Sequence, residues 1–140
     1  MIILDTNVIS EAMQHVPSPR VLRWLLQSRI SGEIFITTIT MAEILYRVEL
    51  LPKGKRRDKL QAEAEALFTV DFPGRILAFG EEAARAFPAI AATRRAQGRP
   101  IAELDAQIAA IAVSHRAALA TRNTADFEGC GVRLVNPWES

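Results

Sequence analysis

Short apolar, β-branched segments alternate along the chain with longer segments in which apolar residues recur at helical spacing. Such alternation is typical of βα units around a parallel sheet, because a helix connects each strand to the next parallel one. We therefore expect an α/β fold with a central sheet of roughly five parallel strands. The short segments predict strands over Ile2–Leu4, Ile34–Thr37, Arg75–Ala78, Ala118–Thr121 and Arg133–Val135.

Five longer segments have a helical pattern or a composition rich in good helix formers. They predict helices over Pro19–Gln27, Met41–Leu51, Arg56–Phe68, Glu81–Gln97 and Ala102–His115. Gly98 follows the fourth helix, at the position where glycine commonly ends a helix. In the fifth helix the spacing predicts one buried face, made of Leu104, Ile108, Ile111 and Ala112.

Size and composition predict one compact domain over residues 1–140. Of the 140 residues, 49% are hydrophobic and 24% are charged, and the mean hydropathy of +0.10 argues against disorder. The net charge is only +1, so any attraction to nucleic acid must come from a local patch. One basic run is the best candidate for contact with RNA, and its alternative interpretation is a solvated loop or helix start. It consists of Lys53, Lys55, Arg56, Arg57 and Lys59.

The sequence favours a cytoplasmic protein. The single cysteine, Cys130, cannot form an intramolecular disulfide, which suits a reducing compartment. The opening residues Met1–Asp5 lack the basic region of a signal peptide. No apolar stretch approaches the ~20 residues that a membrane helix needs. We therefore expect a cytoplasmic location and no contact with a membrane.

Acidic and amide residues recur where the predicted strands end or the following helices begin. Asp5 follows the first strand, Glu43 lies in the first turn of the helix after the second strand, and Asp105 opens the last long helix. Asn123 and Asp126 follow the fourth strand. In open α/β sheets the carboxyl ends of the strands form the rim where ligands bind. We therefore expect Asp5, Glu43 and Asp105 to face one another at this rim.

Each of these residues also has a purely structural interpretation. Asp5 could cap the following helix, and Thr40–Glu43 have the form of a capping box. Asp105 would be favourable at the positive end of a helix macrodipole. Asn123 and Asp126 could form one more helix cap.

Taken together, the acids predict a site for a divalent cation. Carboxylates held close together repel one another unless a positive charge lies between them, and no Lys stands at a strand end. Ligands that are all oxygen suit Mg²⁺ or Mn²⁺ far better than zinc, and such an ion promotes hydrolysis of a phosphodiester. Thr6, Thr121 and Asn123 could orient carboxylates or water. Arg122 could contact a substrate phosphate.

Five segments, taken in their order along the chain, resemble one known family. They are Met1–Ser10, Thr40–Ile44, Leu104–Ala112, Ala120–Phe127 and Asn136–Trp138. Together they span nearly the full length of the chain. The sequence resembles the PIN-domain toxins of the VapC type, in particular their FitB-like branch.

This resemblance implies a three-layer α/β/α sandwich and an Mg²⁺- or Mn²⁺-dependent endoribonuclease, which is the toxin of a type II toxin–antitoxin pair. It implies that Asp5, Glu43 and Asp105 hold the metal ion while water attacks the RNA. Some relatives have an Asp at the position of Asn123, so Asn123 or Asp126 is the implied fourth metal-site residue. The resemblance further implies a homodimer and a larger assembly with a cognate antitoxin, which sometimes places an Arg in the acidic pocket.

Other classes of protein fit the sequence less well. A receiver domain needs a late Lys at a strand end, and no Lys follows Lys59. Gly54–Lys55 has no glycine-rich phosphate loop before it, and neither His15 nor His115 accompanies a nucleophile elbow. The alternative that stays open is a non-catalytic PIN-like module, weakened at Asn123, that binds RNA or protein.

Overall fold

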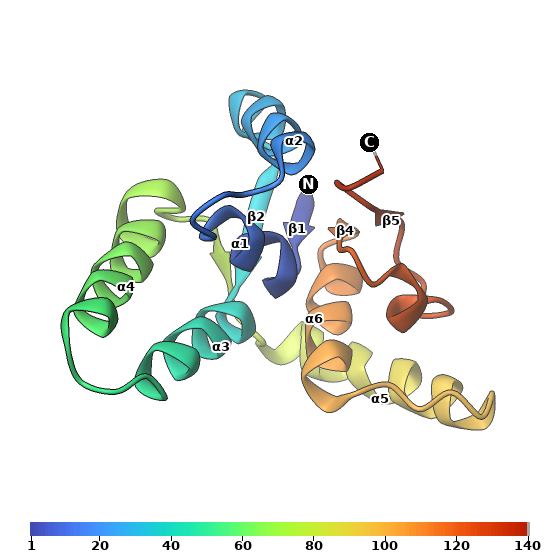
Figure 1. Ribbon diagram of the computed structural model, residues 1–140. Coiled ribbons are helices and arrows are strands. Elements are labelled where there is room, and N and C mark those ends of the chain that lie inside the picture. Colours follow the sequence, from blue (N-terminus) through green and yellow to red (C-terminus); the bar gives the residue numbers. More distant parts are fainter. Residues whose placement is uncertain (140) are drawn as a thin grey trace.

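The computed structural model describes residues 1–139, which contain one parallel sheet. Within this range five strands follow the order β3-β2-β1-β4-β5 (Figure 1). They are β1 (Ile2–Leu4), β2 (Ile34–Thr37), β3 (Ile76–Leu77), β4 (Ala118–Ala120) and β5 (Leu134–Val135). Every neighbouring pair is parallel, which confirms the predicted sheet. The last three strands are one or two residues shorter than predicted.

The central strand β1 determines which residues meet at the carboxyl edge of the sheet. Ile2 pairs with Ile34 of β2 on one side and with Ala118 of β4 on the other. One residue beyond β1, the backbone N–H of Asp5 donates to the carbonyl of Ala120 at 2.8 Å. The strand order reverses direction at β1, and such a switch point is where open α/β sheets bind ligands.

Helices cover both faces of the sheet. Between residues 1 and 139 the α-helices are α1 (Thr6–Ala12), α2 (Pro19–Ile30), α3 (Thr38–Glu49), α4 (Lys55–Ala66), α5 (Glu81–Ala96) and α6 (Glu103–Ser114). A π-helical turn, η1 (Leu67–Asp71), continues α4, and a 3-10 turn, η2 (Thr124–Phe127), follows β4. None of the helices in this range is long and apolar enough to cross a membrane.

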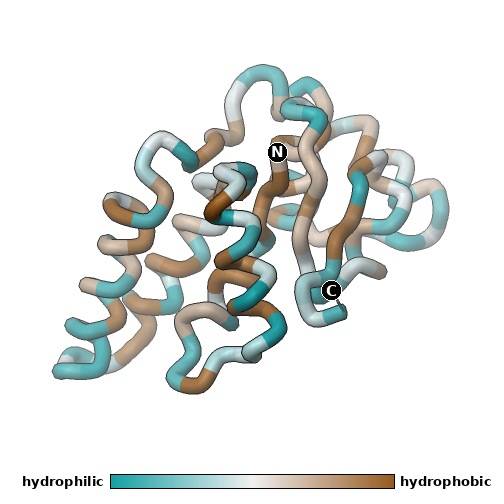
Figure 2. The backbone as a smooth tube through the Cα atoms, turned by 90° about the horizontal axis from the view of Figure 1, so that it is seen from above, coloured by the Kyte–Doolittle hydropathy of each residue, from teal (hydrophilic) through white to brown (hydrophobic). Residues whose placement is uncertain are grey.

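Alternate residues of the strands pack into two separate hydrophobic clusters. Ile3 and Leu119 pack with residues of α5 and α6, whereas Leu4 and Ala120 pack with residues of α1 to α4. The expected three-layer α/β/α sandwich is therefore confirmed. Figure 2 shows the hydrophobic strand segments in the interior and hydrophilic positions concentrated in the outer helices and loops.

Helix α3 begins three residues earlier than predicted because Thr37 caps it. The Thr37 hydroxyl accepts a hydrogen bond from the backbone N–H of Thr40 at 3.1 Å. The predicted capping box, with Thr40 as the cap, is therefore wrong. As a result, Glu43 lies in the second turn of α3 and not in the first.

The predicted buried face of α6 is correct except at its start. Ile108, Ile111 and Ala112 are completely buried, but Leu104 is 47% exposed. Leu104 lies in the first turn of α6, and the buried residues of this helix begin at Ala106. Helical spacing alone could not show where along the helix the contact with the sheet starts.

Candidate active site

Asp5 is held in a fixed orientation directly after β1. Its Oδ1 accepts from the backbone N–H of Thr6 at 2.8 Å, so Asp5 caps α1 as one of its predicted interpretations states. Its Oδ2 accepts from the Thr121 hydroxyl at 2.9 Å and from Asn7 Nδ2 at 3.2 Å. Only 6% of Asp5 is exposed. Its carboxyl group is therefore buried and pre-oriented.

Glu43 is tied to α1 through a chain of two hydroxyl groups. The Thr6 hydroxyl lies 2.9 Å from Glu43 Oε1 and 2.9 Å from the Thr40 hydroxyl. The Thr6 hydroxyl has one proton, which it donates to the carboxylate, so the Thr40 hydroxyl must donate to Thr6. Thr6 and Thr40 are both buried. Thr6 therefore orients Glu43, in agreement with the supporting role predicted for Thr6. The sequence indicated Thr40 only as a helix cap and not as a residue that supports the site.

Thr121 and Asn7 connect Asp5 to the loop after β4. The Thr121 hydroxyl donates to Asp5 and accepts from Asn7 Nδ2 at 3.3 Å and from the backbone N–H of Asn123 at 3.1 Å. The side-chain oxygen Oδ1 of Asn7 accepts from the backbone N–H of Arg122 at 3.3 Å. Sequence reasoning missed Asn7, although its place two residues after Asp5, in the first turn of α1, was a usable signal.

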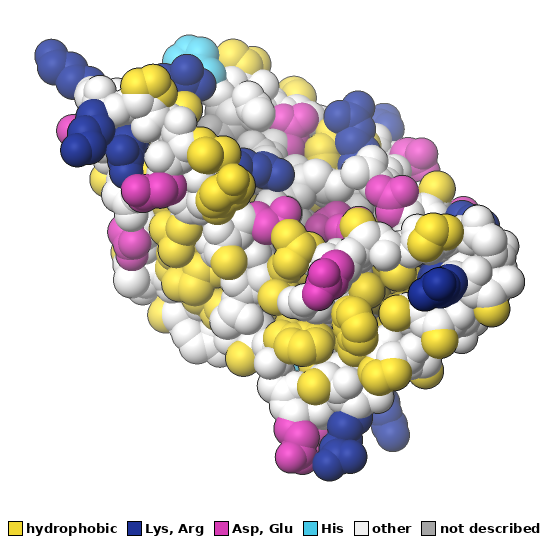
Figure 3. All heavy atoms as spheres, turned by 90° about the horizontal axis from the view of Figure 1, so that it is seen from below, with side chains coloured by type: hydrophobic (Ala, Val, Ile, Leu, Met, Phe, Trp, Pro, Cys, Tyr) yellow, Lys and Arg dark blue, Asp and Glu magenta, His cyan; other side chains and the backbone are white. Residues whose placement is uncertain are grey.

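The electrostatics of Asp105 show that four acids share one region. Burial and, to a smaller extent, the negative charges of Asp5, Asp126 and Glu43 together raise the pKa of Asp105 to about 6, while Arg94 opposes the shift. Burial also raises the pKa of Asp5; hydrogen bonds from Thr121 and Thr6 oppose this, and Glu43 and Asp126 reinforce it. We call Asp5, Glu43, Asp105 and Asp126 the acid cluster. Figure 3 shows acidic side chains gathered near the middle of one face.

Asn123 and Asp126, the two candidates for the fourth position, differ in their environment. Asp126 lies in η2, and its charge acts on both Asp5 and Asp105 although its side chain is exposed. Asn123 stands at the N-cap position of η2, but its side chain makes no capping hydrogen bond. The predicted helix cap is therefore correct in the position of Asn123 but not in the use of its side chain. The charge of Asp126 makes it the stronger of the two candidates.

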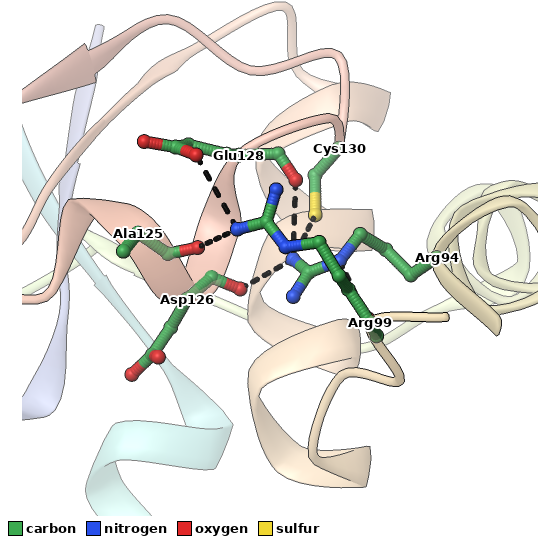
Figure 4. A network of polar contacts seen from close by, with 6 residues as sticks. All are labelled: Arg94, Arg99, Ala125, Asp126, Glu128 and Cys130. Atoms are coloured by element: carbon green, nitrogen blue, oxygen red, sulfur yellow. Dashed lines mark hydrogen bonds and ion pairs between the residues drawn. The ribbon is translucent and has the colours of Figure 1, made fainter. Parts of the chain in front are cut away.

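A buried arginine holds the loop that carries Asp126 (Figure 4). Arg94 of α5 is only 4% exposed, and its Nη1 donates to the carbonyls of Asp126 at 2.6 Å and Glu128 at 3.1 Å. Its Nε donates to the Arg99 carbonyl at 2.8 Å. Arg99 in turn contacts the Ala125 carbonyl and the Glu128 carboxylate. Sequence reasoning missed Arg94 because nothing in a helix pattern marks a buried arginine.

The donor atoms of the acid cluster fit a hard divalent cation, but not without side-chain movement. Within residues 1–139 no three His, Cys, Asp or Glu side chains already lie close enough together to ligate one ion. The pKa shifts nevertheless couple the four acids, because Coulomb repulsion extends well beyond the coordination distance of about 2 Å. Repulsion separates carboxylates that have no cation between them. All four groups are carboxylates, the ligands that Mg²⁺ and Mn²⁺ prefer.

The predicted basic run lies at the start of α4 and is partly neutralised. Arg57 pairs with Glu49 at 3.0 Å, and Lys59 lies 4.0 Å from Glu63. Arg56 and Lys59 line a cleft of about 710 Å³ formed by α1, α3 and α4. Lys53 and Lys55 are exposed beside it, so contact of the run with RNA stays a prediction.

The fold and the acid cluster together define the class of this protein. A parallel sheet in this strand order, with acids from β1, α3, α6 and the loop after β4 at its carboxyl edge, is the architecture expected of a PIN-like domain. The family model described as "PIN domain" matches residues 2–129. The chain belongs to the PIN-domain family.

Within this family the chain is similar to VapC-type proteins. It is 40% identical over 138 residues to Toxin FitB of Neisseria gonorrhoeae, and 37% identical over 139 residues to VapC ribonuclease Y4jK of Sinorhizobium fredii; each match covers 99% of both chains. It also matches the crystal structure of FitAcB from Neisseria gonorrhoeae, with a TM-score of 0.88 and 39% identity over the full length of both chains. The resemblance noted from the sequence is confirmed.

We predict that Asp105→Asn stabilises the metal-free protein at neutral pH. The pKa of Asp105 rises from 3.8 to about 6 on folding, so its ionisation destabilises the folded state as the pH rises through this range. Two pKa units correspond to about 3 kcal/mol, and solvent screening of this half-buried group reduces the expected gain to roughly 1–2 kcal/mol. Urea denaturation in EDTA should show this gain at pH 7.5 and little of it at pH 4.

Asp58→Asn is the matched control, because it removes the same charge from an exposed position of α4. Its free energy of unfolding should change by less than about 0.5 kcal/mol. If Asp105→Asn were less stable than the wild type at pH 7.5, the destabilising effect of ionised Asp105, caused by its burial and by the neighbouring acids, would be contradicted.

We also predict that Arg94→Met lowers the free energy of unfolding by roughly 2–4 kcal/mol, because it leaves the carbonyls of the Asp126 loop without their donor. Arg94→Lys should recover only part of the loss, since an ammonium group lacks the planar fork of donors. Chemical denaturation beside Arg95→Met, a change at the exposed neighbour of Arg94 on α5, measures this effect. Equal stability of Arg94→Met and Arg95→Met would show that the network contributes nothing.

Proposed function

We propose that this protein is a metal-dependent endoribonuclease that hydrolyses RNA phosphodiesters and acts as the toxin of a toxin–antitoxin pair. The observation that carries the proposal is the acid cluster at the switch point of the sheet, where the pKa values of Asp5 and Asp105 are raised. Acids whose pKa values are raised by burial and by one another are typical of functional sites, and a bound cation would compensate their charges. The names of the similar proteins, a toxin and a VapC ribonuclease, support the same conclusion.

Asp5, Glu43 and Asp105 are the residues that would hold Mg²⁺ or Mn²⁺, with Asp126 or Asn123 as the fourth. When bound, the ion would lower the pKa of a water and neutralise the charge that develops on the phosphate. A nearby cation would also remove the repulsion that raises the pKa of Asp105. Asp105 would then be ionised throughout the neutral pH range.

The remaining residues of the site orient these carboxylates. Thr121 and Asn7 hold Asp5 Oδ2, which leaves Asp5 little rotational freedom. Thr6 does the same for one oxygen of Glu43. Pre-orientation of this kind reduces the reorganisation needed when the ion and the substrate bind. Arg122, exposed one residue beyond Thr121, is placed to contact a phosphate of the RNA.

The partners follow from the same proposal. A cognate antitoxin inhibits the enzyme, and an Arg inserted into the acid cluster would compete with the metal ion for the carboxylates. The functional unit is a homodimer that forms a larger assembly with the antitoxin, in the cytoplasm. The basic run at the start of α4 is a second proposed contact with the RNA backbone.

The second candidate is a PIN-like module that binds RNA or protein without cleaving it. The neutral Asn123 favours it, because an amide in place of a carboxylate weakens a metal site. The charge of Asp126 on Asp5 and Asp105 argues against it.

Cleavage of a mixed RNA pool by antitoxin-free protein tests the two candidates. We expect cutting with Mg²⁺ or Mn²⁺, none with EDTA, and a loss of at least 100-fold in Asp5→Asn and Asp105→Asn, because each removes a charged ligand without changing its shape. Glu33→Gln, which removes an exposed carboxylate before β2 at the amino ends of the strands, should cut like the wild type. Wild-type activity in Asp105→Asn would overturn its role. A folded wild-type protein that binds Mn²⁺ in calorimetry but cuts no RNA would favour the binding module.

A further inference from the structure

A second, smaller cleft of about 210 Å³ adjoins the acid cluster on the side of α1. Asn7 lines this cleft and also donates to Asp5, so the two sites share a wall. Arg122 lines it as well, one residue after the buried Thr121 that holds Asp5. Any ligand in the cleft is therefore adjacent to the acids.

The outer wall of the cleft is a stacked pair formed by Arg122 and Trp138. The guanidinium carbon of Arg122 lies over the indole ring, 5.1 Å from its centroid. Both groups are flat and polarisable, and both are used by proteins to stack on unpaired nucleobases. Trp138 is partly buried and packs against the hydrophobic cluster that contains Leu4 and Ala120, and the carbonyls of Trp138 and Arg122 both accept hydrogen bonds. The exposed part of the indole and the guanidinium group of Arg122 therefore form the surface on which a base can stack.

The indole is fixed in place by the C-terminal segment, which returns to the side of α2 (Figure 1). Arg20 of α2 donates to the Trp138 carbonyl at 3.0 Å, and the backbone N–H of Trp138 donates to Asn136 Oδ1 at 3.0 Å. Asn136 Nδ2 in turn contacts the Arg122 carbonyl at 3.5 Å. Two contacts thus hold the backbone of Trp138, and a third joins Asn136 to Arg122, so that the partly exposed indole is placed beside Arg122 although it lies 133 positions from Asp5 in the sequence.

The rest of the cleft is polar and carries more positive than negative charge. Arg47 of α3 is anchored at 2.6 Å to the Ser10 hydroxyl, and with Arg122 it gives two guanidinium groups against one carboxylate, Glu11. Gln14 adds a side-chain amide, which has both donors and an acceptor for a base edge. A stacking surface, amides and two cations together match a base and its phosphates.

We propose that this cleft binds one unpaired nucleotide of the RNA substrate next to the bond that is cleaved. Trp138 and Arg122 provide the stacking surface for its base, and the guanidinium groups of Arg122 and Arg47 neutralise its phosphates. The place of the nucleotide beside the cleaved bond rests on the proposed ribonuclease function. Its binding in the cleft does not depend on cleavage, so the two proposals fail separately.

Fluorescence of Trp138 tests the binding directly. The chain has two tryptophans, and Trp24→Phe leaves Trp138 as the only one. A pool of single-stranded hexaribonucleotides, titrated in EDTA and again in Ca²⁺, should quench its emission saturably because the base stacks on the indole. Arg122→Gln in this background should weaken binding about tenfold. Arg133→Ala should leave binding unchanged, because Arg133 is exposed at the amino end of β5, whereas the cleft lies at the carboxyl ends of the strands. Absence of quenching in both conditions would overturn the proposal.

Cleavage kinetics give an independent test. In Trp138→Ala the KM for RNA should rise about tenfold with little change in kcat, and Trp138→Phe should restore most of the loss because a smaller ring still stacks. Sequencing of the cut ends should show a weakened base preference next to the cleaved bond. Trp138→Phe covers the case in which the alanine variant does not fold. Unchanged KM and base preference in Trp138→Ala would contradict the inference while leaving the ribonuclease proposal intact.

Discussion

The burial of carboxyl groups close to one another is the constraint around which the rest of the site is arranged. Burial is the largest cause of the raised pKa values of Asp5 and Asp105, the neighbouring acids add to it, and the opposing effect of Arg94 on Asp105 is the smallest. A fold can maintain such a cluster only if its members are held by other contacts. For Asp5 these are three hydrogen bonds, and for Glu43 the bond from Thr6. The stability given up at this site is consistent with the binding of a cation.

The parallel sheet explains why these acids meet. The register places the carboxyl ends of β1 and β4 side by side, so that Asp5 and Thr121 come into contact across 116 positions of the chain. Helix α3 starts directly after β2 and places Glu43 at the same carboxyl edge of the sheet, where the Thr6 hydroxyl donates a hydrogen bond to it. Arg94 holds the loop after β4 from the far side, through the backbone carbonyls of Asp126 and Glu128 and a contact with the Cys130 sulfur. Two layers of helices and the sheet between them thus each contribute one part of the site.

The small cleft beside the acid cluster extends this arrangement from chemistry to recognition. The Asn7 side chain belongs to both the acid site and the cleft, because its amide group donates a hydrogen bond to Asp5 and the residue also lines the cleft. The stacked pair of Arg122 and Trp138 gives the cleft a surface suited to an unpaired base. In the proposed ribonuclease, the acids would therefore act on the backbone while the cleft reads a neighbouring nucleotide.

The α/β class, the parallel sheet and the segments that carry Asp5, Glu43 and Asp105 could be predicted from the sequence, because strand and helix periods and strand-end positions are local properties of the chain. The neighbours of these residues could not be predicted, because they depend on how the chain folds. Thr37, and not Thr40, caps α3, and Leu104 is exposed at the start of α6. The negative charge of Asp126 helps to raise the pKa of Asp105. Arg94, Asn7 and Trp138 had no recognised role in the sequence, since their contacts join residues far apart along the chain. Local patterns record what a segment prefers, whereas burial, charge coupling and hydrogen-bond partners exist only once distant segments are packed together.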